Sequence, residues 1–365
     1  MERVNIALYL HSLQKHGTQR VAVNLCTHLI DRGYKVTLVT QYQLSNEFDT
    51  PQGVKRIISD IDDEEISNSR VRNFRRRFMK LRRIWQTEKP DVILSFIGFN
   101  NIMAILTSRF LSTKVIVAMR CDPDTELPNW RMRFAARFLY RFADRVLLQV
   151  DANRDFFPAA VARKAVVVKN PINLRFFRPC YKGEREKTIV SATRLHESKN
   201  HQLLIRAFAH ITANHPDYQL IIYGEGEERD NLKVLIAKLK LDERVKLAGH
   251  VDNLEEVIYR AGIYVLCSNS EGMPNTLVEA MLLGLACVTT DCPGAGQSEI
   301  INHGVNGLLI PRNDIDKLVE SLEYLITQPE AAERIGHAAH LLQNSYNPLI
   351  VYGEWERQIL ETKGL

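Results

Sequence analysis

Two glutamates separated by seven residues stand out in the second half of the chain. Glu271 and Glu279 belong to residues 270–281, which follow an apolar, strand-like run. Pro274 suits the start of a helix, and Gly272 lets a ligand approach the backbone closely. A helix beginning there would direct its N–H groups and its dipole at an anion such as phosphate. The two carboxylates could then accept hydrogen bonds from a nucleotide-sugar, one from the sugar and one from the ribose.

Taken alone, the same residues also fit a helix cap followed by a solvent-facing glutamate, because glutamate is common on exposed helix faces. A second pair of residues favours a ligand site. Arg194 and Lys199 follow the strand-like run 188–192 in the same half of the chain. Cations are usually surface charges, but a fork-shaped donor and a point charge together suit a departing diphosphate. The four residues therefore predict a single diphosphate-binding site.

Short apolar runs alternate with segments of helical period through almost the whole chain. Short buried strands separated by helices are typical of βαβ units with parallel sheets. We predict strands over residues 4–10, 35–40, 91–96, 114–118, 145–149, 165–169, 188–192, 219–223, 245–247, 263–267, 286–290 and 307–310. We predict helices that include residues 19–31, 201–214, 227–239, 276–283 and 348–361.

A proline-marked stretch near residues 170–173 interrupts this alternation, as expected at a domain boundary. We therefore predict an α/β protein with two Rossmann-like parallel-sheet domains facing a cleft, residues 1–172 and 173–345. Ligands of such sheets bind beyond the carboxyl ends of the strands, where both residue pairs lie. A last helix within 346–365 carries Trp355 on an apolar face, and we expect it to pack back onto the first domain.

The second half resembles the retaining GT-B glycosyltransferases of glycosyltransferase family 4. The resemblance covers most of residues 170–345 and rests on the E-x7-E element and on Arg194 with Lys199. Supporting marks are G-E-G at 224–226, G-H-V at 249–251 and the stretch 293–299 with its S-E-I-I ending. The resemblance implies that Arg194 and Lys199 hold the diphosphate, Glu271 the donor sugar and Glu279 the ribose. The further donor-binding residues that it implies are Gly224, Val251, Gly272, Met273, Pro274, Asn275 and Thr276.

The first half is similar to the same family more loosely. Family members commonly carry a turn reading G-G-A-E-R after the first strand, and this chain has H-G-T-Q-R at residues 16–20. Gly17 is retained and is placed with the donor-binding residues, whereas His16 replaces a glycine and Gln19 a carboxylate.

A second mark of the first half is the run M-R-C-D-P at residues 119–123. It resembles the V-R-N-D-P form found among polysaccharide-building members of the family. Arg120 would stand where other members have a histidine near the reacting sugar. It could act in the active site or form only a structural salt bridge.

Three rival functions fit the residues less well. The G-E-G run lacks the third glycine of a dinucleotide site, and acids crowd the place of the pyrophosphate, which disfavours a dehydrogenase. The basic first half carries no helix-turn-helix, zinc or RNA-stacking signature, so we expect no nucleic-acid partner. Paired aspartates resemble the D-x-D metal ligands of GT-A enzymes, but they occur in three different contexts, and we predict no metal and no cofactor. These pairs are Asp60/Asp62, Asp122/Asp124 and Asp314/Asp316.

Charge is divided unequally along the chain. Residues 1–175 carry 29 Lys and Arg against 17 Asp and Glu, whereas residues 176–365 carry 19 against 26. The basic half includes two amphipathic stretches near 70–85 and 131–145, which suit an anionic membrane surface. Alternatively, their apolar faces could simply pack on the first sheet. We favour a mixed arrangement, in which the apolar faces are largely packed and the arginines meet lipid phosphates or a diphosphate-linked acceptor. No apolar run reaches the roughly 20 residues that span a bilayer, and six scattered cysteines suit reduced thiols.

Together with the family resemblance, these features predict a cytoplasmic enzyme, peripheral on the inner face of the plasma membrane. It would transfer a hexose or N-acetylhexosamine from a UDP-sugar, with retention, to a polyprenyl-diphosphate-linked or lipopolysaccharide glycan. The alternatives are a glycosyltransferase with a soluble acceptor and an inactive, membrane-associated sugar-binding protein.

Overall fold

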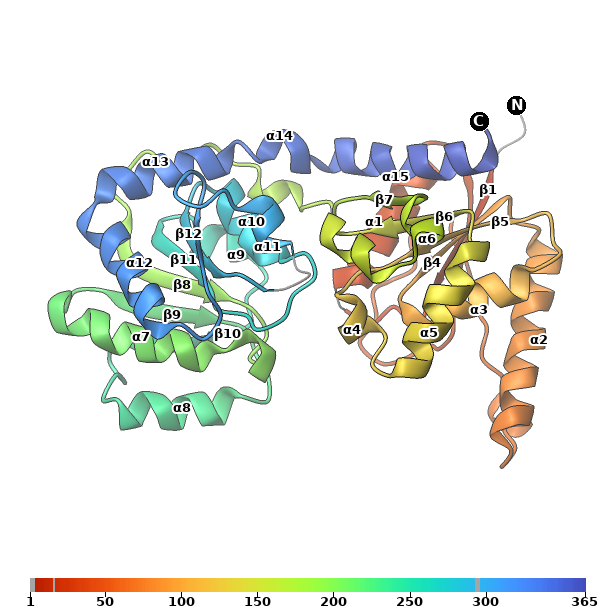
Figure 1. The fold of residues 1–365 in the computed structure, drawn as a ribbon, viewed down its shortest axis with the longest axis horizontal. Coiled ribbons are helices and arrows are strands. Elements are labelled where there is room, and N and C mark those ends of the chain that lie inside the picture. The colour runs from red at the N-terminus through yellow and green to blue at the C-terminus, as the bar shows by residue number, and fades with distance from the viewer. Residues whose placement is uncertain (1–3, 16, 293–295) are drawn as a thin grey trace. The chain divides into compact units, whose positions relative to one another are not determined.

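The computed structural model describes residues 4–15, 17–292 and 296–365 and contains two compact units (Figure 1). Unit 1 comprises Met1–Asn170 and Leu349–Leu365, and unit 2 comprises Pro171–Pro348. Each unit holds one sheet of parallel strands with helices on both faces, which is the Rossmann-like architecture that the sequence predicted. The chain leaves unit 1 after Asn170, two residues before the expected position.

The sheet of unit 1 has the strand order β3-β2-β1-β4-β5-β6-β7, so the order reverses between β1 and β4. Its strands are β1 (Asn5–Leu10), β2 (Lys35–Thr40), β3 (Lys55–Ile58), β4 (Val92–Phe96), β5 (Lys114–Ala118), β6 (Arg145–Leu148) and β7 (Ala165–Val167). Its helices are α1 (Gly17–Asp31), α2 (Arg70–Glu88), α3 (Gly98–Ser108), α4 (Pro123–Glu126), α5 (Trp130–Leu139), α6 (Ala159–Ala162) and α15 (Pro348–Lys363).

Side chains of β1 alternate between two hydrophobic cores, as the two-residue period of a strand requires. Ile6, Leu8 and Leu10 face the core formed with α1 and α15, whereas Ala7 and Tyr9 face the core formed with α2, α3 and α5. Both faces of the sheet are therefore covered, which explains why its central strands read as continuous apolar runs.

Strand β3 was not predicted. Its sequence begins with Lys55 and Arg56, and its residues are at least partly exposed because it forms one edge of the sheet. Charged residues are usual on edge strands, but they remove the apolar signal by which the other strands were predicted.

Helix α15 completes the core of unit 1. The ring of Trp355 is fully buried and stacks on Phe96 with 5.7 Å between the ring centroids. The next residue, Glu356, accepts hydrogen bonds from Tyr34 at 2.6 Å and from Arg32 at 3.3 Å, and it lies 3.1 Å from His28. An apolar contact and a polar contact thus fix α15 to the sheet and to α1.

Replacing Glu356 with glutamine should lower the free energy of unfolding of unit 1 by about 1–3 kcal/mol, because charged hydrogen bonds are lost. Burial raises the pKa of Glu356, but the bonds from Tyr34, His28 and Arg32 outweigh it and lower the pKa. The carboxylate therefore contributes stability above the ordinary value of 4.5, and this contribution is lost as the pH falls through the lower folded pKa.

Thermal unfolding measured across this pH range tests the prediction. Glu354→Gln is a matched control, since Glu354 lies on the same helix and, among the described residues, its carboxylate bonds only to Arg357 and Gln358 of that helix. Equal unfolding midpoints for the wild type and Glu356→Gln would show that α15 is held by its apolar contacts alone.

The sheet of unit 2 has the order β10-β9-β8-β11-β12-β13, so its order reverses between β8 and β11. Its strands are β8 (Glu186–Ala192), β9 (Gln219–Tyr223), β10 (Val245–Gly249), β11 (Ala261–Leu266), β12 (Ala286–Thr290) and β13 (Leu308–Ile310). Its helices are α7 (His201–Asn214), α8 (Arg229–Lys238), α9 (Leu254–Val257), α10 (Asn275–Leu282), α11 (Gln297–Ile300), α12 (Ile315–Thr327), α13 (Pro329–His340) and α14 (Gln343–Tyr346).

Candidate active site

Lys199 and Glu271 form an ion pair in unit 2, with 2.6 Å between Nζ and Oε1. Lys199 ends a short 3-10 helix after β8, and Glu271 lies in the loop after β11. These loops meet because β8 and β11 are parallel neighbours, so their carboxyl ends lie side by side. Only 18% of the lysine side chain and 10% of the glutamate side chain are exposed, which strengthens their attraction.

Ser268 holds the carboxylate of this pair. Its hydroxyl donates to the same Oε1 of Glu271 at 2.6 Å. Its carbonyl accepts hydrogen bonds from the Thr290 hydroxyl at 2.6 Å and the Cys292 thiol at 2.8 Å. Ser268 was not predicted from the sequence; the available signal was a hydroxyl residue directly after the predicted strand and three positions before Glu271.

The loops after β8, β9 and β10 pack closely against one another at glycines, which have no side chain to hold the backbones apart. The N–H of Gly224 donates to the carbonyl of Gly249 at 2.7 Å. A Cβ at Gly224 would lie 2.0 Å from the carbonyl oxygen of Thr193, and one at Gly226 would lie 2.2 Å from that of Leu195. The half-buried Val251 follows this cluster. The backbones of three loops thus lie in close contact at the carboxyl edge of the sheet.

Helix α10 begins at Asn275, next to Pro274. At its first turn the hydroxyl of Tyr264 on β11 donates to Thr276 at 2.9 Å, which fixes the helix to the sheet. Glu279 is only 8% exposed, so it is not the solvent-facing glutamate of the alternative interpretation. The loop before the helix is anchored as well, since the carbonyl of Gly272 accepts an N–H from Gly296 at 2.8 Å. Met273 lies 3.8 Å from the hydroxyl of Tyr346.

Arg194 and His201 complete the loop after β8. Arg194 is exposed, and among the residues that the structure describes no carboxylate pairs with it, so its guanidinium can meet an anionic ligand. His201 was not predicted; it is 3% exposed, and its Nε2 lies 2.9 Å from the Thr193 hydroxyl. Burial and the nearby Lys199 lower the pKa of His201 to about 4, so it is neutral near pH 7.

Arg120 lies inside unit 1, after β5. Its guanidinium bonds to Asn170, lies 3.5 Å from the carbonyl of Val168, and sits 4.9 Å from the ring centroid of Trp355. Burial lowers its pKa to about 10. These contacts are hydrogen bonds and a cation–π contact, rather than the salt bridge that the sequence suggested as the structural alternative. Unit 1 also holds Gly17, the first residue of α1; His16 lies outside the described residues.

Glu126 organises the loops around Arg120. Its carboxylate accepts backbone N–H groups from Gly98 at 2.7 Å, Arg120 at 2.8 Å and Cys121 at 3.2 Å. Burial raises the pKa of Glu126 to about 7, against the opposing effect of these bonds. Glu126 was not predicted from the sequence, because a single glutamate three residues after a proline does not indicate the two loops that it joins.

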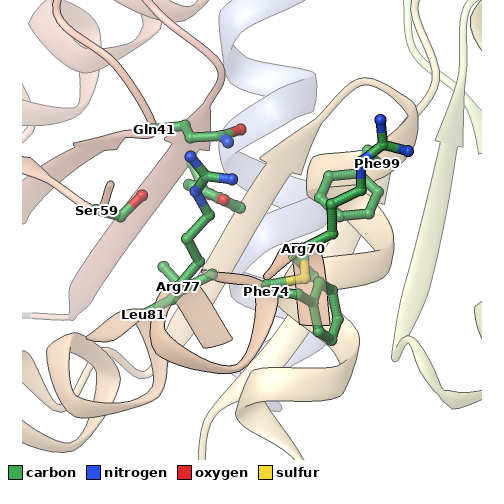
Figure 2. Close-up of a pocket in the computed structure, with 9 residues that line it drawn as sticks. Gln41, Ser59, Arg70, Phe74, Arg77, Leu81 and Phe99 are labelled. Carbon is green, nitrogen blue, oxygen red and sulfur yellow. The ribbon is translucent and has the colours of Figure 1, made fainter. Parts of the chain in front are cut away.

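A cavity of about 90 Å³, open to solvent, lies in unit 1 between α2, α3 and the carboxyl ends of β1, β2 and β3 (Figure 2). It spans the point where the strand order reverses, and it combines apolar groups with a few polar groups, as small-molecule sites do. The sequence did not predict it. Its lining residues are Tyr9, Gln41, Ser59, Arg70, Phe74, Arg77, Leu81, Phe99 and Met103.

At least one aspartate of each pair has a partner within the protein. Asp60 pairs with Arg77, Asp124 pairs with Arg133 at 2.6 Å, and Asp314 caps α12 by accepting the N–H of Lys317 at 2.9 Å. Within residues 4–15, 17–292 and 296–365, no three His, Cys, Asp or Glu side chains are grouped so that they could hold a metal ion.

Two family models match the chain one after the other. The model described as "Glycosyltransferase Family 4" matches residues 16–176, and the model described as "Glycosyl transferases group 1" matches residues 176–341. The chain belongs to the family 4 glycosyltransferases. The two matches meet where the chain passes from unit 1 to unit 2, so each unit of this glycosyltransferase corresponds to one model.

Full-length relatives are bacterial glycosyltransferases. One, an uncharacterized glycosyltransferase of Haemophilus influenzae, is 24% identical over 93% of this chain and 95% of its own. Another, from Campylobacter jejuni, is named "GalNAc-alpha-(1->4)-GalNAc-alpha-(1->3)-diNAcBac-PP-undecaprenol alpha-1,4-N-acetyl-D-galactosaminyltransferase" and is 22% identical over 99% of both chains. The solved structure of Anabaena HepE in complex with UDP matches with a TM-score of 0.83 at 17% identity, covering 98% and 100% of the chains. The predicted GT-B fold is therefore confirmed.

Proposed function

We propose that this glycosyltransferase moves a hexose or N-acetylhexosamine from a UDP-sugar to a lipid-linked glycan, with retention of the anomeric configuration. The observation that carries the proposal is the Lys199–Glu271 pair at the carboxyl edge of the unit 2 sheet. Arg194 lies on the same loop as Lys199 and has no carboxylate partner among the described residues. The Campylobacter relative is named for a diphospho-undecaprenol-linked acceptor, and the Anabaena structure contains UDP, which supports these substrate classes.

The charges of the site suit stabilisation of a leaving diphosphate. When the bond between the sugar and the diphosphate breaks, negative charge grows on the phosphate oxygens, and Lys199 and Arg194 would neutralise it. Glu271 would accept hydrogen bonds from the sugar hydroxyls and Glu279 from the ribose. In this mechanism the protein positions the reactants and stabilises the departing charge; these residues form no covalent bond with the sugar.

A lipid-linked acceptor would place the enzyme in the cytoplasm, peripheral on the inner face of the plasma membrane. The arginines of its basic regions near 70–85 and 131–145 would meet the anionic head groups. No helix in the described part of the chain has both the length and the apolar character needed to cross a bilayer. A soluble acceptor is the alternative substrate, and an inactive sugar-binding protein is the alternative function. The buried Lys199–Glu271 pair favours an enzyme over the latter.

We expect the purified enzyme to release UDP, and not GDP or ADP, when it is incubated with a panel of nucleotide-sugars. Because two cations serve the diphosphate, excess chelator should leave the turnover unchanged. Proton NMR of the product should show the same anomeric configuration as the donor sugar. Strict dependence on manganese would contradict the cation assignment, and an inverted product would contradict the retaining mechanism.

A further inference from the structure

Five exposed aromatic side chains line one surface of unit 1. Four follow one another at four-residue spacing along α5 and the 3-10 turn after it (Tyr140–Phe142), and the fifth lies in the loop after α3, the helix on which α5 packs (Figure 1). Their exposed fractions range from 40% to 92%, whereas aromatic residues are usually well buried. We call them the aromatic stripe; its members are Trp130, Phe134, Phe138, Phe142 and Phe110.

The stripe is not the packing face of α5. Ala136 and Tyr140 are fully buried in the core of unit 1, and Met132 and Leu139 pack against that core. Residues two positions apart on a helix point in nearly opposite directions, so the stripe lies on the far side from this set. The proposal from sequence that these phenylalanines simply pack on the sheet is therefore wrong for α5, because other residues pack there.

Arginines lie directly on the stripe. The guanidinium carbon of Arg141 is 3.5 Å from the ring centroid of Phe138, and that of Arg109 is 4.5 Å from the centroid of Phe142. The exposed Arg131 and Arg137 belong to the same helix, and no acidic residue occurs between Glu126 and Asp144. Cation–π contacts stabilise exposed rings in water and keep the positive charges beside them.

Phe110 is held outward by its backbone. It has a φ of 63°, in the left-handed region that is costly for a bulky residue, and it is 92% exposed. The loop is fixed by Arg82 of α2, whose guanidinium donates to the carbonyls of Thr107 at 2.9 Å and Arg109 at 2.8 Å. A strained backbone that presents an apolar ring to solvent suggests that the ring has a contact to make.

Helix α2 differs from α5 although both are basic. Its Leu81 and Trp85 are buried, as the packing interpretation of the sequence expected. Two of its cations have acidic partners within the protein: Arg77 pairs with Asp60, and Lys80 lies 3.4 Å from Asp62. Several charges of α2 therefore already have partners, and only its first half exposes apolar residues.

We propose that the aromatic stripe is the surface by which unit 1 enters the interface of an anionic bilayer, with α5 parallel to the membrane plane. This inference rests on the proposed function, because a lipid-linked acceptor is met at a membrane. Aromatic rings favour the depth of the lipid head groups, and long arginine side chains reach the phosphates from the same helix. Because the charge beside the rings is positive throughout, we expect the stripe to bind an anionic lipid surface.

Trp130 gives a direct test, because the other two tryptophans, Trp85 and Trp355, are buried. Phosphatidylcholine vesicles that contain phosphatidylglycerol should shift the emission of Trp130 to shorter wavelength, and vesicles of phosphatidylcholine alone should have little effect. The triple variant Phe110→Ser, Phe134→Ser, Phe138→Ser should bind the anionic vesicles roughly 100-fold more weakly, since three rings no longer leave water.

The matched control replaces three exposed apolar residues of α2, Val71, Phe74 and Met79, with serine, and it should bind as the wild type does. Thermal unfolding of both variants verifies that they are folded. Unchanged binding of the stripe variant, or a wild type that binds no vesicle, would overturn the proposal. Vesicle binding needs no donor or acceptor, so a failure here and a failure of the UDP-sugar assay are separate results.

Discussion

Lys199→Ala should lower the rate of sugar transfer by roughly 100- to 1000-fold, which is typical when a group that stabilises transition-state charge is removed. The effect should fall mainly on kcat, because the charge on the diphosphate grows as the sugar departs. The variant also leaves Glu271 buried without its cation, which adds electrostatic repulsion toward the diphosphate. The measurement is steady-state release of UDP at saturating donor.

Lys187→Ala is the matched control, since Lys187 belongs to the same unit and pairs with Asp217 at the surface. Its turnover should equal that of the wild type. Glu271→Gln should also be strongly impaired, and the double variant Lys199→Ala with Glu271→Gln should lose less than the product of the single losses, because the two residues act as a pair. A kcat within twofold of wild type for folded Lys199→Ala would remove this residue from the site.

Gly224→Ala should destabilise unit 2 by about 3 kcal/mol and abolish donor binding. The φ of Gly224 is 131°, which L side chains rarely adopt, and the added Cβ would lie 2.0 Å from the carbonyl oxygen of Thr193. Relief of this clash would separate the loops after β8 and β9, and the first of these carries Arg194 and Lys199. Thermal unfolding and UDP binding by calorimetry measure the two effects.

Gly304→Ala is the control that distinguishes the steric clash at Gly224 from the strain of a positive φ. Gly304 also has a positive φ, 76°, but no atom lies within 4 Å of the position that a Cβ would take. It should lose only about 1 kcal/mol and keep its affinity for UDP. If both alanine variants were equally stable, the close approach of the loops at Gly224 would not be a constraint on the site.

Most strands of the two sheets could be predicted from the sequence, because buried parallel strands appear as apolar runs. Residues 35–40 and 219–223 are examples, and they form β2 and β9 in the structure. The sequence was sufficient for the fold as well, since such runs alternate with helices. It failed at β3, where Lys55 and Arg56 hide an edge strand.

The sequence was sufficient to predict where the site lies, but not which of its side chains contact one another. Post-strand positions indicated that Lys199 and Glu271 would be near each other, yet the sequence grouped Lys199 with Arg194 and not with the glutamate that it contacts. Ser268 and Glu126 were missed for one physical reason. Each acts by joining loops that are distant along the chain, and such contacts exist only after the sheet has formed.

Trp355 belongs to the core of unit 1 but lies near the end of the chain. Unit 1 therefore begins to be synthesised first, yet it can complete its core only after unit 2 has been synthesised. At the usual synthesis rate, residue 349 leaves the ribosome roughly 10 to 35 seconds after residue 170. During that interval α15 does not yet cover its face of the sheet. Phe96 and the guanidinium of Arg120, which contact Trp355 in the folded unit, are then uncovered. Unit 2 is continuous in sequence and can close first. The nascent first unit would therefore expose this apolar surface until α15 has been synthesised, and we expect chaperones to bind it during that interval.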